Sequence, residues 1–214
     1  MNTKAVIFDM DGTLLDTQRI CIEAWDFAGE KQGFENIGRY IPEVCGMNEA
    51  GWTKELERLL DGGDIEKFKE DSRDYIIKNL KVEFKEGALE TLLFLKQKNI
   101  KMALASGSTV GSIMHHLKEV NATDFFQVIV GSGDVKNGKP APDIFLLAAE
   151  KLGVEPSECI VFEDSENGIK AAHSAGMKTI GIPDLKGFSE DTKKLMFKEM
   201  KTMSEAIDFF EDSF

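Results

Sequence analysis

The feature that most constrains the fold is a series of short apolar runs, separated by segments with helical spacing. Most of the runs are nearly continuous rather than alternating with polar residues, which is typical of strands covered on both faces. The predicted strands are residues 4–9, 101–105, 127–131, 159–162 and 178–182. The predicted helices between them are 86–98, 109–119, 142–152 and 165–175. This alternation predicts an α/β fold built on a doubly wound parallel sheet.

A second, helical unit is expected after the first strand, because a simple crossover to the next strand needs far fewer residues than the chain supplies. Helical spacing recurs over residues 17–30, 48–60 and 64–79. We therefore expect a core domain of residues 1–14 and 81–214 and a helical cap domain of residues 15–80. The tail is expected to add a small strand near 197–201 and a last helix at 203–211.

Two carboxylates stand where the first strand should end, in AVIFDMDGT. Side chains two residues apart in an extended segment point the same way, so Asp9 and Asp11 face one spot, at the edge where open α/β sheets bind ligands. Like charges placed so closely predict either a divalent metal, with magnesium favoured by oxygen ligands, or a split acid/base pair. The alternative is ordinary turn capping, since Asp-Gly is a common turn.

Polar groups also follow three later strands. Ser106 stands in ALASGSTV, where a Gly-rich turn can present backbone N–H groups to an anion, and Lys139 stands in KNGKPAPD, a loop stiffened by prolines. Glu163 and Asp164 end an apolar strand in IVFEDSENGI. Singly, each has a simpler explanation, such as a helix cap or a solvated loop lysine. Together, the strand ends favour one magnesium–phosphate site.

These motifs resemble the four motifs of the haloacid dehalogenase-like superfamily, in the expected order and across nearly the whole chain. DMDGT, the Ser after ALA, the Lys in GKPAPD, and FEDSENGI carry the resemblance. The last two are particularly similar to the β-phosphoglucomutase-like and phosphoglycolate-phosphatase-like group, whose members insert a helical cap after the first motif. The resemblance thus implies a Rossmann-like core with an α-helical cap.

The resemblance also implies roles for the acidic residues. Asp9 resembles the nucleophile that forms an aspartyl-phosphate, and Asp11 resembles the general acid/base. It implies that Mg²⁺ is held by the Asp9 carboxylate, the Asp11 backbone carbonyl and Asp164, with Glu163 a direct or indirect ligand.

The remaining implied roles concern the phosphoryl group and the rest of the substrate. Ser106 and Lys139, with Gly107 beside the serine, would bind the transferring phosphoryl oxygens. Substrate selectivity is expected from cap residues that face the site. The candidates are Cys21, Trp25, Cys45, Met47 and Asn48. Their apolar character favours a small substrate with few extra charges, such as a sugar phosphate.

The choice of reaction depends on Asp11 and on the cap. Relatives that cleave carbon–halogen bonds lack the second Asp, so Asp11 indicates phosphoryl transfer. Sugar-phosphate mutases of the group carry a His where this chain has Cys21, and cations where it has Cys45 and Glu49. A bisphosphate intermediate would therefore meet little positive charge, and we predict a phosphatase, with a β-phosphoglucomutase-type mutase as the alternative.

A candidate from another class is a receiver-like domain that is phosphorylated on Asp and signals without turnover. Such domains use a similar acidic site with a Ser/Thr and a Lys. They place the phosphorylated Asp on a central strand away from the N-terminus, however, and they lack a cap of this length.

Composition limits the partners. A net charge of −12 without a block of Lys and Arg argues against nucleic acid. Cys21, Cys45 and Cys159 form no CxxC pair and are expected to be buried, reduced thiols. No apolar stretch is long enough to span a membrane. We expect a cytoplasmic protein, monomeric or weakly dimeric, with Mg²⁺ and a small phosphorylated substrate.

Overall fold

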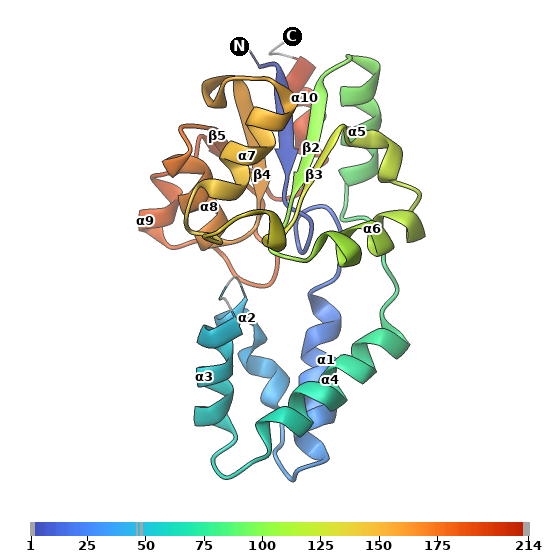
Figure 1. The fold of residues 1–214 in the computed structure, drawn as a ribbon, viewed down its shortest axis with the longest axis vertical. Coiled ribbons are helices and arrows are strands. Elements are labelled where there is room, and N and C mark those ends of the chain that lie inside the picture. The colour runs from blue at the N-terminus through green and yellow to red at the C-terminus, as the bar shows by residue number, and fades with distance from the viewer. Residues whose placement is uncertain (1–2, 46, 48, 212–214) are drawn as a thin grey trace. The chain divides into compact units, whose positions relative to one another are not determined.

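The computed structural model describes residues 3–45, 47 and 49–211 (Figure 1). The chain divides into two compact units: a core unit, Met1–Asp16 with Val82–Phe214, and a helical unit, Thr17–Lys81. The predicted boundaries followed residues 14 and 80. The observed ones follow Asp16 and Lys81, two residues and one residue later. The backbone N–H of Asp16 donates to the Glu83 carbonyl at 2.9 Å, which ties both linker ends to the core unit.

The core unit contains a parallel six-stranded sheet in the order β3-β2-β1-β4-β5-β6, so the predicted doubly wound parallel sheet is confirmed. Its strands are β1 (Ala5–Phe8), β2 (Lys101–Ala105), β3 (Val128–Val130), β4 (Cys159–Glu163), β5 (Lys178–Gly181) and β6 (Lys198–Glu199). The helices are α5 (Ala88–Gln97), α6 (Val110–Glu119), α7 (Asp143–Leu152), α8 (Glu166–Ser174), α9 (Glu190–Lys193) and α10 (Glu205–Glu211). Single 3₁₀ turns lie at Thr123–Phe125, Ser132–Asp134 and Pro156–Glu158.

Helices cover both faces of the sheet, which explains why the strands are apolar throughout (Figure 1). Val6 and Phe8 belong to the apolar cluster that includes side chains of α5, α6 and α10. Ala5 and Ile7 belong to the opposite cluster, formed with α7 and α8. All four side chains of β1 are fully buried, so neither face of this strand has a place for a polar residue before position 9.

β1 lies at the point where the order of the sheet reverses. β2 pairs with one side of β1 and β4 with the other, so that Phe8 is in register with both Leu104 and Phe162. Because the strands are parallel, the segments that follow all three strands meet at one edge of the sheet. Such a switch point is where open α/β sheets bind their ligands.

The helical unit consists of α1 (Arg19–Glu30), a 3₁₀ turn (Ile37–Tyr40), α2 (Ile41–Val44), α3 (Glu49–Leu59) and α4 (Ile65–Asn79). α1, α3 and α4 match the three predicted helical segments, whereas the turn and α2 were not predicted. Trp25 of α1 packs edge-on against the fully buried Phe68 of α4, with ring centroids 5.6 Å apart. Asp64 caps α4 by accepting a hydrogen bond from the Lys67 N–H at 2.9 Å.

Among the described residues, the structure has no helix that combines the length and the apolar character needed to cross a membrane.

Candidate active site

Three buried carboxylates meet where β1 and β4 end. Asp9 follows β1 directly, and its N–H donates to the Phe162 carbonyl at 3.0 Å. Glu163 is the last residue of β4, and Asp164 comes next. One oxygen from each of the three carboxylates lies within 4.8 Å of the others. We call these three residues the acidic cluster; their oxygen atoms are ligands of the kind that Mg²⁺ prefers.

Lys139 supplies a positive charge inside the acidic cluster. Its Nζ donates to Asp9 Oδ1 at 2.5 Å and to Glu163 Oε2 at 2.7 Å. Burial alone would lower the pKa of Lys139, but the Asp9 and Glu163 carboxylates outweigh that effect and hold the pKa above its ordinary value. The side chain is therefore a fixed ammonium at the switch point, 11% exposed.

The acidic cluster carries more negative charge than one lysine can balance. Burial raises the pKa of Asp9 to about 8; the Lys139 ammonium opposes this rise, and Glu163 and Asp11 add to it. Burial, with Glu163 and Asp9, also raises the pKa of Asp164 well above its usual value. A divalent cation would remove this penalty, so the residues present fit a metal ion.

Hydrogen bonds fix the orientation of the Glu163 and Asp164 carboxylates. Glu163 Oε1 accepts from the N–H and the hydroxyl of Ser165, at 2.9 and 2.8 Å, which leaves Oε2 for Lys139. The Thr13 hydroxyl donates to Asp164 Oδ1 at 2.9 Å. Ser165 is also the N-cap of α8, where its Oγ accepts from the Gly168 N–H. The start of α8 and the acidic cluster are thus one hydrogen-bonded structure.

Asp11 lies outside the acidic cluster as the three carboxylates define it, and its side chain contacts the turn after β2. Oδ2 of Asp11 accepts from the Ser106 hydroxyl at 3.2 Å and from the Ser108 hydroxyl at 2.8 Å. The Ser108 N–H in turn donates to Ser106 Oγ at 3.0 Å. Gly107 stands exposed between the two serines.

Ser108 was not among the predicted site residues. The segment SGS contains two serines, and a turn that points both hydroxyls at one carboxylate cannot be told from sequence spacing alone. The structure thus brings Lys139 into contact with Asp9 and Glu163, places Asp164 in the same cluster, and holds Asp11 against Ser106 and Ser108.

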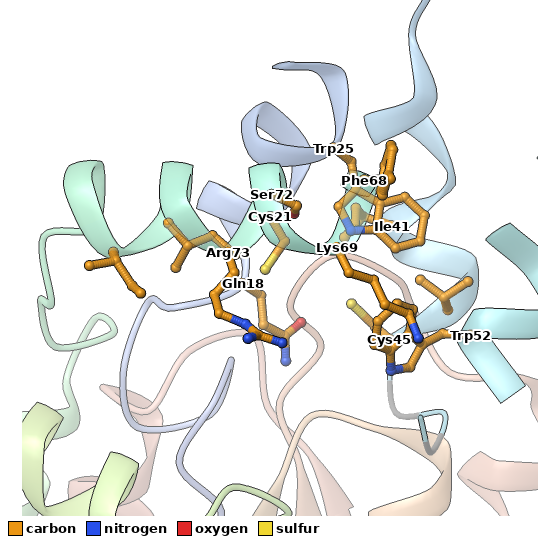
Figure 2. Close-up of a pocket in the computed structure, with 13 residues that line it drawn as sticks. Gln18, Cys21, Trp25, Ile41, Cys45, Trp52, Phe68, Lys69, Ser72 and Arg73 are labelled. Atoms are coloured by element: carbon orange, nitrogen blue, oxygen red, sulfur yellow. The ribbon is translucent and has the colours of Figure 1, made fainter. Parts of the chain in front are cut away.

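The helical unit contains an open cavity of about 400 Å³ (Figure 2). Its lining residues are Gln18, Cys21, Trp25, Ile41, Val44, Cys45, Trp52, Phe68, Lys69, Ser72, Arg73, Ile76 and Ile77. Three of the five predicted selectivity residues, Cys21, Trp25 and Cys45, are among them. Met47 is exposed and does not line the cavity, and Asn48 lies outside the described residues.

Two cations of α4, Lys69 and Arg73, also line the cavity (Figure 2). The expectation that a bisphosphate would meet little positive charge did not include these two cations. It was based on the segments around Cys21 and Cys45, whereas both cations come from a helix that follows them in the chain. Their i, i+4 spacing puts them on one face of α4, but nothing in the sequence indicates that this face borders a cavity.

The expectation of buried thiols holds for Cys159 alone. Cys159 is buried, and burial, with the nearby Glu158, raises the pKa of its thiol to about 11. Cys21 and Cys45 are half-buried because the cavity reaches them. None of the three forms a disulfide.

Comparison with known proteins gives a consistent result. The profile described as a haloacid dehalogenase-like hydrolase matches residues 3–176. The phosphorylated carbohydrates phosphatase of Thermotoga maritima is 36% identical over 183 residues, which cover 83% of each chain. The β-phosphoglucomutase of Bacillus subtilis is 36% identical over 196 residues, covering 84% of this chain and 83% of that protein.

A solved structure extends the similarity to the complete fold. The crystal structure of a Thermotoga maritima protein assigned as a β-phosphoglucomutase has a TM-score of 0.83 and 30% identity, covering 99% of this chain and 100% of that chain. The family match over most of the chain and these relatives confirm the resemblance of the four motifs. The chain belongs to the haloacid dehalogenase-like hydrolase family.

Proposed function

We propose that this hydrolase is a magnesium-dependent phosphatase that releases phosphate from a small phosphorylated metabolite. The observation that carries the proposal is the contact of Asp9 with Lys139 within a cluster of carboxylates suited to a divalent cation. Such a site combines a nucleophile with the positive charge that a transferring phosphoryl group needs. Relatives named as a carbohydrate phosphatase and a sugar-phosphate mutase support the same substrate class, sugar phosphates included.

In the proposed mechanism, a carboxylate oxygen of Asp9 attacks phosphorus, and the bond from phosphorus to the substrate's alcohol oxygen breaks. Asp11 gives its proton to that oxygen and then takes a proton from the water that hydrolyses the aspartyl-phosphate. Lys139 and Ser106, with the exposed backbone at Gly107, bind the phosphoryl oxygens. Asp9, the Asp11 carbonyl and Asp164, with Glu163 beside them, would hold Mg²⁺, which supplies positive charge that offsets the charge on the phosphoryl group.

The second candidate is a sugar-phosphate mutase, and Lys69 and Arg73 favour it. A mutase must hold a bisphosphate intermediate, so it needs cations that can bind the second phosphate. Both cations line the cavity of the helical unit. The same cations also suit a phosphatase whose substrate carries a second anionic group, so the reaction has to be decided by experiment.

Phosphate release from p-nitrophenyl phosphate in the presence of Mg²⁺ tests the first proposal, with Asp9→Asn as the matched blank. We expect a rate at least about a thousandfold above the blank, because the variant lacks the nucleophile. Loss of activity with a chelator and its return with Mg²⁺ would support the metal assignment.

The same protein, given β-glucose 1-phosphate and a trace of β-glucose 1,6-bisphosphate, distinguishes the two candidates. Formation of glucose 6-phosphate without net phosphate release would favour the mutase. No release from any ester, together with a stable phosphoryl group on Asp9, would instead indicate a phosphoryl-sensing domain.

A further inference from the structure

An aromatic ring lies against the Lys139 ammonium in the core unit. Lys139 Nζ is 5.0 Å from the centroid of the Phe145 ring, within the distance of about 6 Å at which the face of a ring attracts a cation. Phe145 is fully buried and the Lys139 side chain is 11% exposed, so little water competes for this contact. Because the attraction between a cation and a ring grows when both leave water, the contact is a strong one of its kind.

Hydrogen bonds on both sides of this contact hold the lysine loop and the start of α7. Phe145 is the third residue of α7, and its N–H donates to the Pro142 carbonyl at 3.1 Å. In the loop, the Ala141 N–H donates to the Gly138 carbonyl at 3.0 Å, which closes a turn around Lys139. The ring also belongs to the apolar cluster that α7 and α8 form with the sheet. Phe145 is therefore a fixed surface for the ammonium.

The two hydrogen bonds of Lys139 do not fix the ammonium by themselves. Nζ donates to Asp9 and to Glu163, which accept two of the three N–H groups of an ammonium. A flexible side chain held at two points can still swing about the line that joins the two acceptor oxygens, and a third contact removes this freedom. The Phe145 ring provides that contact without a negative charge, so the third N–H and the positive charge stay available to an anion.

We propose that Phe145 is a positioning residue for phosphoryl transfer, whose ring holds the Lys139 ammonium where its third N–H meets a phosphoryl oxygen. This inference rests on the proposed phosphatase function for the reaction, but its effect on the binding of phosphate is measurable without turnover. The competing explanation is that Phe145 only fills the apolar core between α7 and the sheet. The two explanations differ in whether the electron density of the ring matters.

Fluorinated rings at position 145 separate electron density from volume. Fluorine withdraws electrons from the ring face and adds little volume, so phenylalanine with one, two or three fluorine atoms should attract the ammonium progressively less. We expect kcat/KM to fall at each step, by about fivefold to thirtyfold with three fluorines, because the ammonium is less well placed. The loss should be equal for an alkyl phosphate and for p-nitrophenyl phosphate, since Lys139 acts on the phosphoryl group that both esters share. Phe145→Leu, which removes the ring, should lower kcat/KM at least as far.

Phe125 offers a matched control for the fluorinated rings. Lys96 Nζ is 4.9 Å from the centroid of this buried ring, so the same kind of contact is present. Phe125 precedes β3 and therefore lies toward the amino ends of the parallel strands, whereas the acidic cluster lies at their carboxyl ends. Fluorine at position 125 should leave kcat/KM unchanged. If fluorine at position 145 leaves kcat/KM equally unchanged, Phe145 is a core residue only, and the phosphatase proposal stands without it.

Binding of inorganic phosphate provides the readout that needs no turnover. In calorimetric titrations with Mg²⁺ present, the Kd for phosphate should rise with the number of fluorine atoms at position 145 and stay constant for those at position 125. The unfolding temperature should change by similar amounts in the two series, which excludes unfolding as the cause.

The two readouts distinguish failure of this inference from failure of the proposed function. Progressively weaker phosphate binding in a protein that hydrolyses no ester would support the role of Phe145 and reject the phosphatase. Phosphate binding that does not depend on fluorine, in a protein that hydrolyses esters, would reject the role of Phe145. A protein that neither binds phosphate nor hydrolyses an ester would reject both.

Discussion

Ser108 holds the side chain of Asp11, the residue proposed to transfer a proton. The Ser108 hydroxyl donates to Asp11 Oδ2 at 2.8 Å, a shorter contact than the 3.2 Å from Ser106. Both hydroxyls donate to the same oxygen, so they hold the carboxylate from one side. Ser106 is also assigned to the phosphoryl oxygens, which makes Ser108 the residue whose effect on Asp11 can be isolated.

Ser108→Ala should therefore slow the reaction in a way that depends on the leaving group. An alkoxide leaving group needs the proton from Asp11, whereas p-nitrophenolate is stable without it. We expect kcat to fall about tenfold to a hundredfold for an alkyl phosphate and less than about threefold for p-nitrophenyl phosphate. Steady-state kinetics on both esters measures the difference.

Ser112→Ala is a suitable control for the Ser108 variant. Ser112 belongs to α6, which follows the same turn, and its backbone N–H donates to the side chain of Thr109, the N-cap of that helix. This change should leave both rates unaltered. Equal losses on the two esters in Ser108→Ala would mean that Ser108 supports the turn and does not orient Asp11.

At the scale of elements, the sheet and the acidic cluster were predictable because both follow from the positions of the apolar runs. Continuous apolar runs identify the strands, and the parallel arrangement brings the residues after β1 and β4 to one edge. The ends of these two apolar runs therefore identify the three carboxylates, Asp9, Glu163 and Asp164. Lys139 was expected at the same site from the resemblance to the family, as a group that binds phosphoryl oxygens. Its hydrogen bonds to Asp9 and Glu163 were not predicted, since nothing in the loop sequence itself fixes the direction of that side chain.

The helical unit was harder to predict in detail. The periodicity of α1, α3 and α4 was sufficient to locate these helices, but the turn at Ile37–Tyr40 and α2 are too short for a period to be visible. The cavity depends on how the helices pack, which no single segment specifies. Lys69 and Arg73 were consequently missed, although the helix that carries them was predicted.

α8 approaches β4 so closely that a glycine is required between them. A Cβ placed on Gly168 would lie 1.9 Å from Glu163 Cδ and Oε2, and the Glu163 side chain, 1% exposed, has no free space to move into. Gly168→Ala should lower the free energy of unfolding by about 1–3 kcal/mol. It should also displace the oxygen that binds Lys139, and so weaken Mg²⁺ binding. Thermal unfolding and a Mg²⁺ titration of activity measure the two effects.

Gly111→Ala is the corresponding control in α6. The nearest atom to a Cβ at Gly111 is Thr109 Oγ1 at 4.0 Å, so the added methyl group meets no obstruction. Alanine is the better helix former, and this variant should be unchanged or more stable by up to about 1 kcal/mol. If the two variants have similar stabilities, the close approach of α8 to Glu163 does not constrain the fold.

For the whole molecule, the acidic cluster makes the stability of the fold depend on the binding of a proton. A carboxyl group whose pKa is higher in the folded than in the unfolded chain binds a proton more tightly when folded. Burial raises the pKa of Asp9 from 3.8 to about 8. Between these two pH values the metal-free folded protein retains a proton that the unfolded chain has released, so its stability should fall as the pH rises.

The measurement is thermal unfolding in a chelator at pH 6 and pH 8. For one proton, the free energy of unfolding cannot change with pH by more than about 1.4 kcal/mol per pH unit. We expect the midpoint temperature of unfolding to be lower at pH 8 than at pH 6. With Mg²⁺ the difference should shrink, because the cation favours the ionised carboxylates and takes the place of the proton. Asp9→Asn should reduce the pH dependence in the chelator, since the amide does not titrate in this range. If the unfolding temperature of the metal-free protein rises from pH 6 to pH 8, the acidic cluster does not hold a proton. The electrostatic reason for assigning a divalent cation to the cluster is then lost.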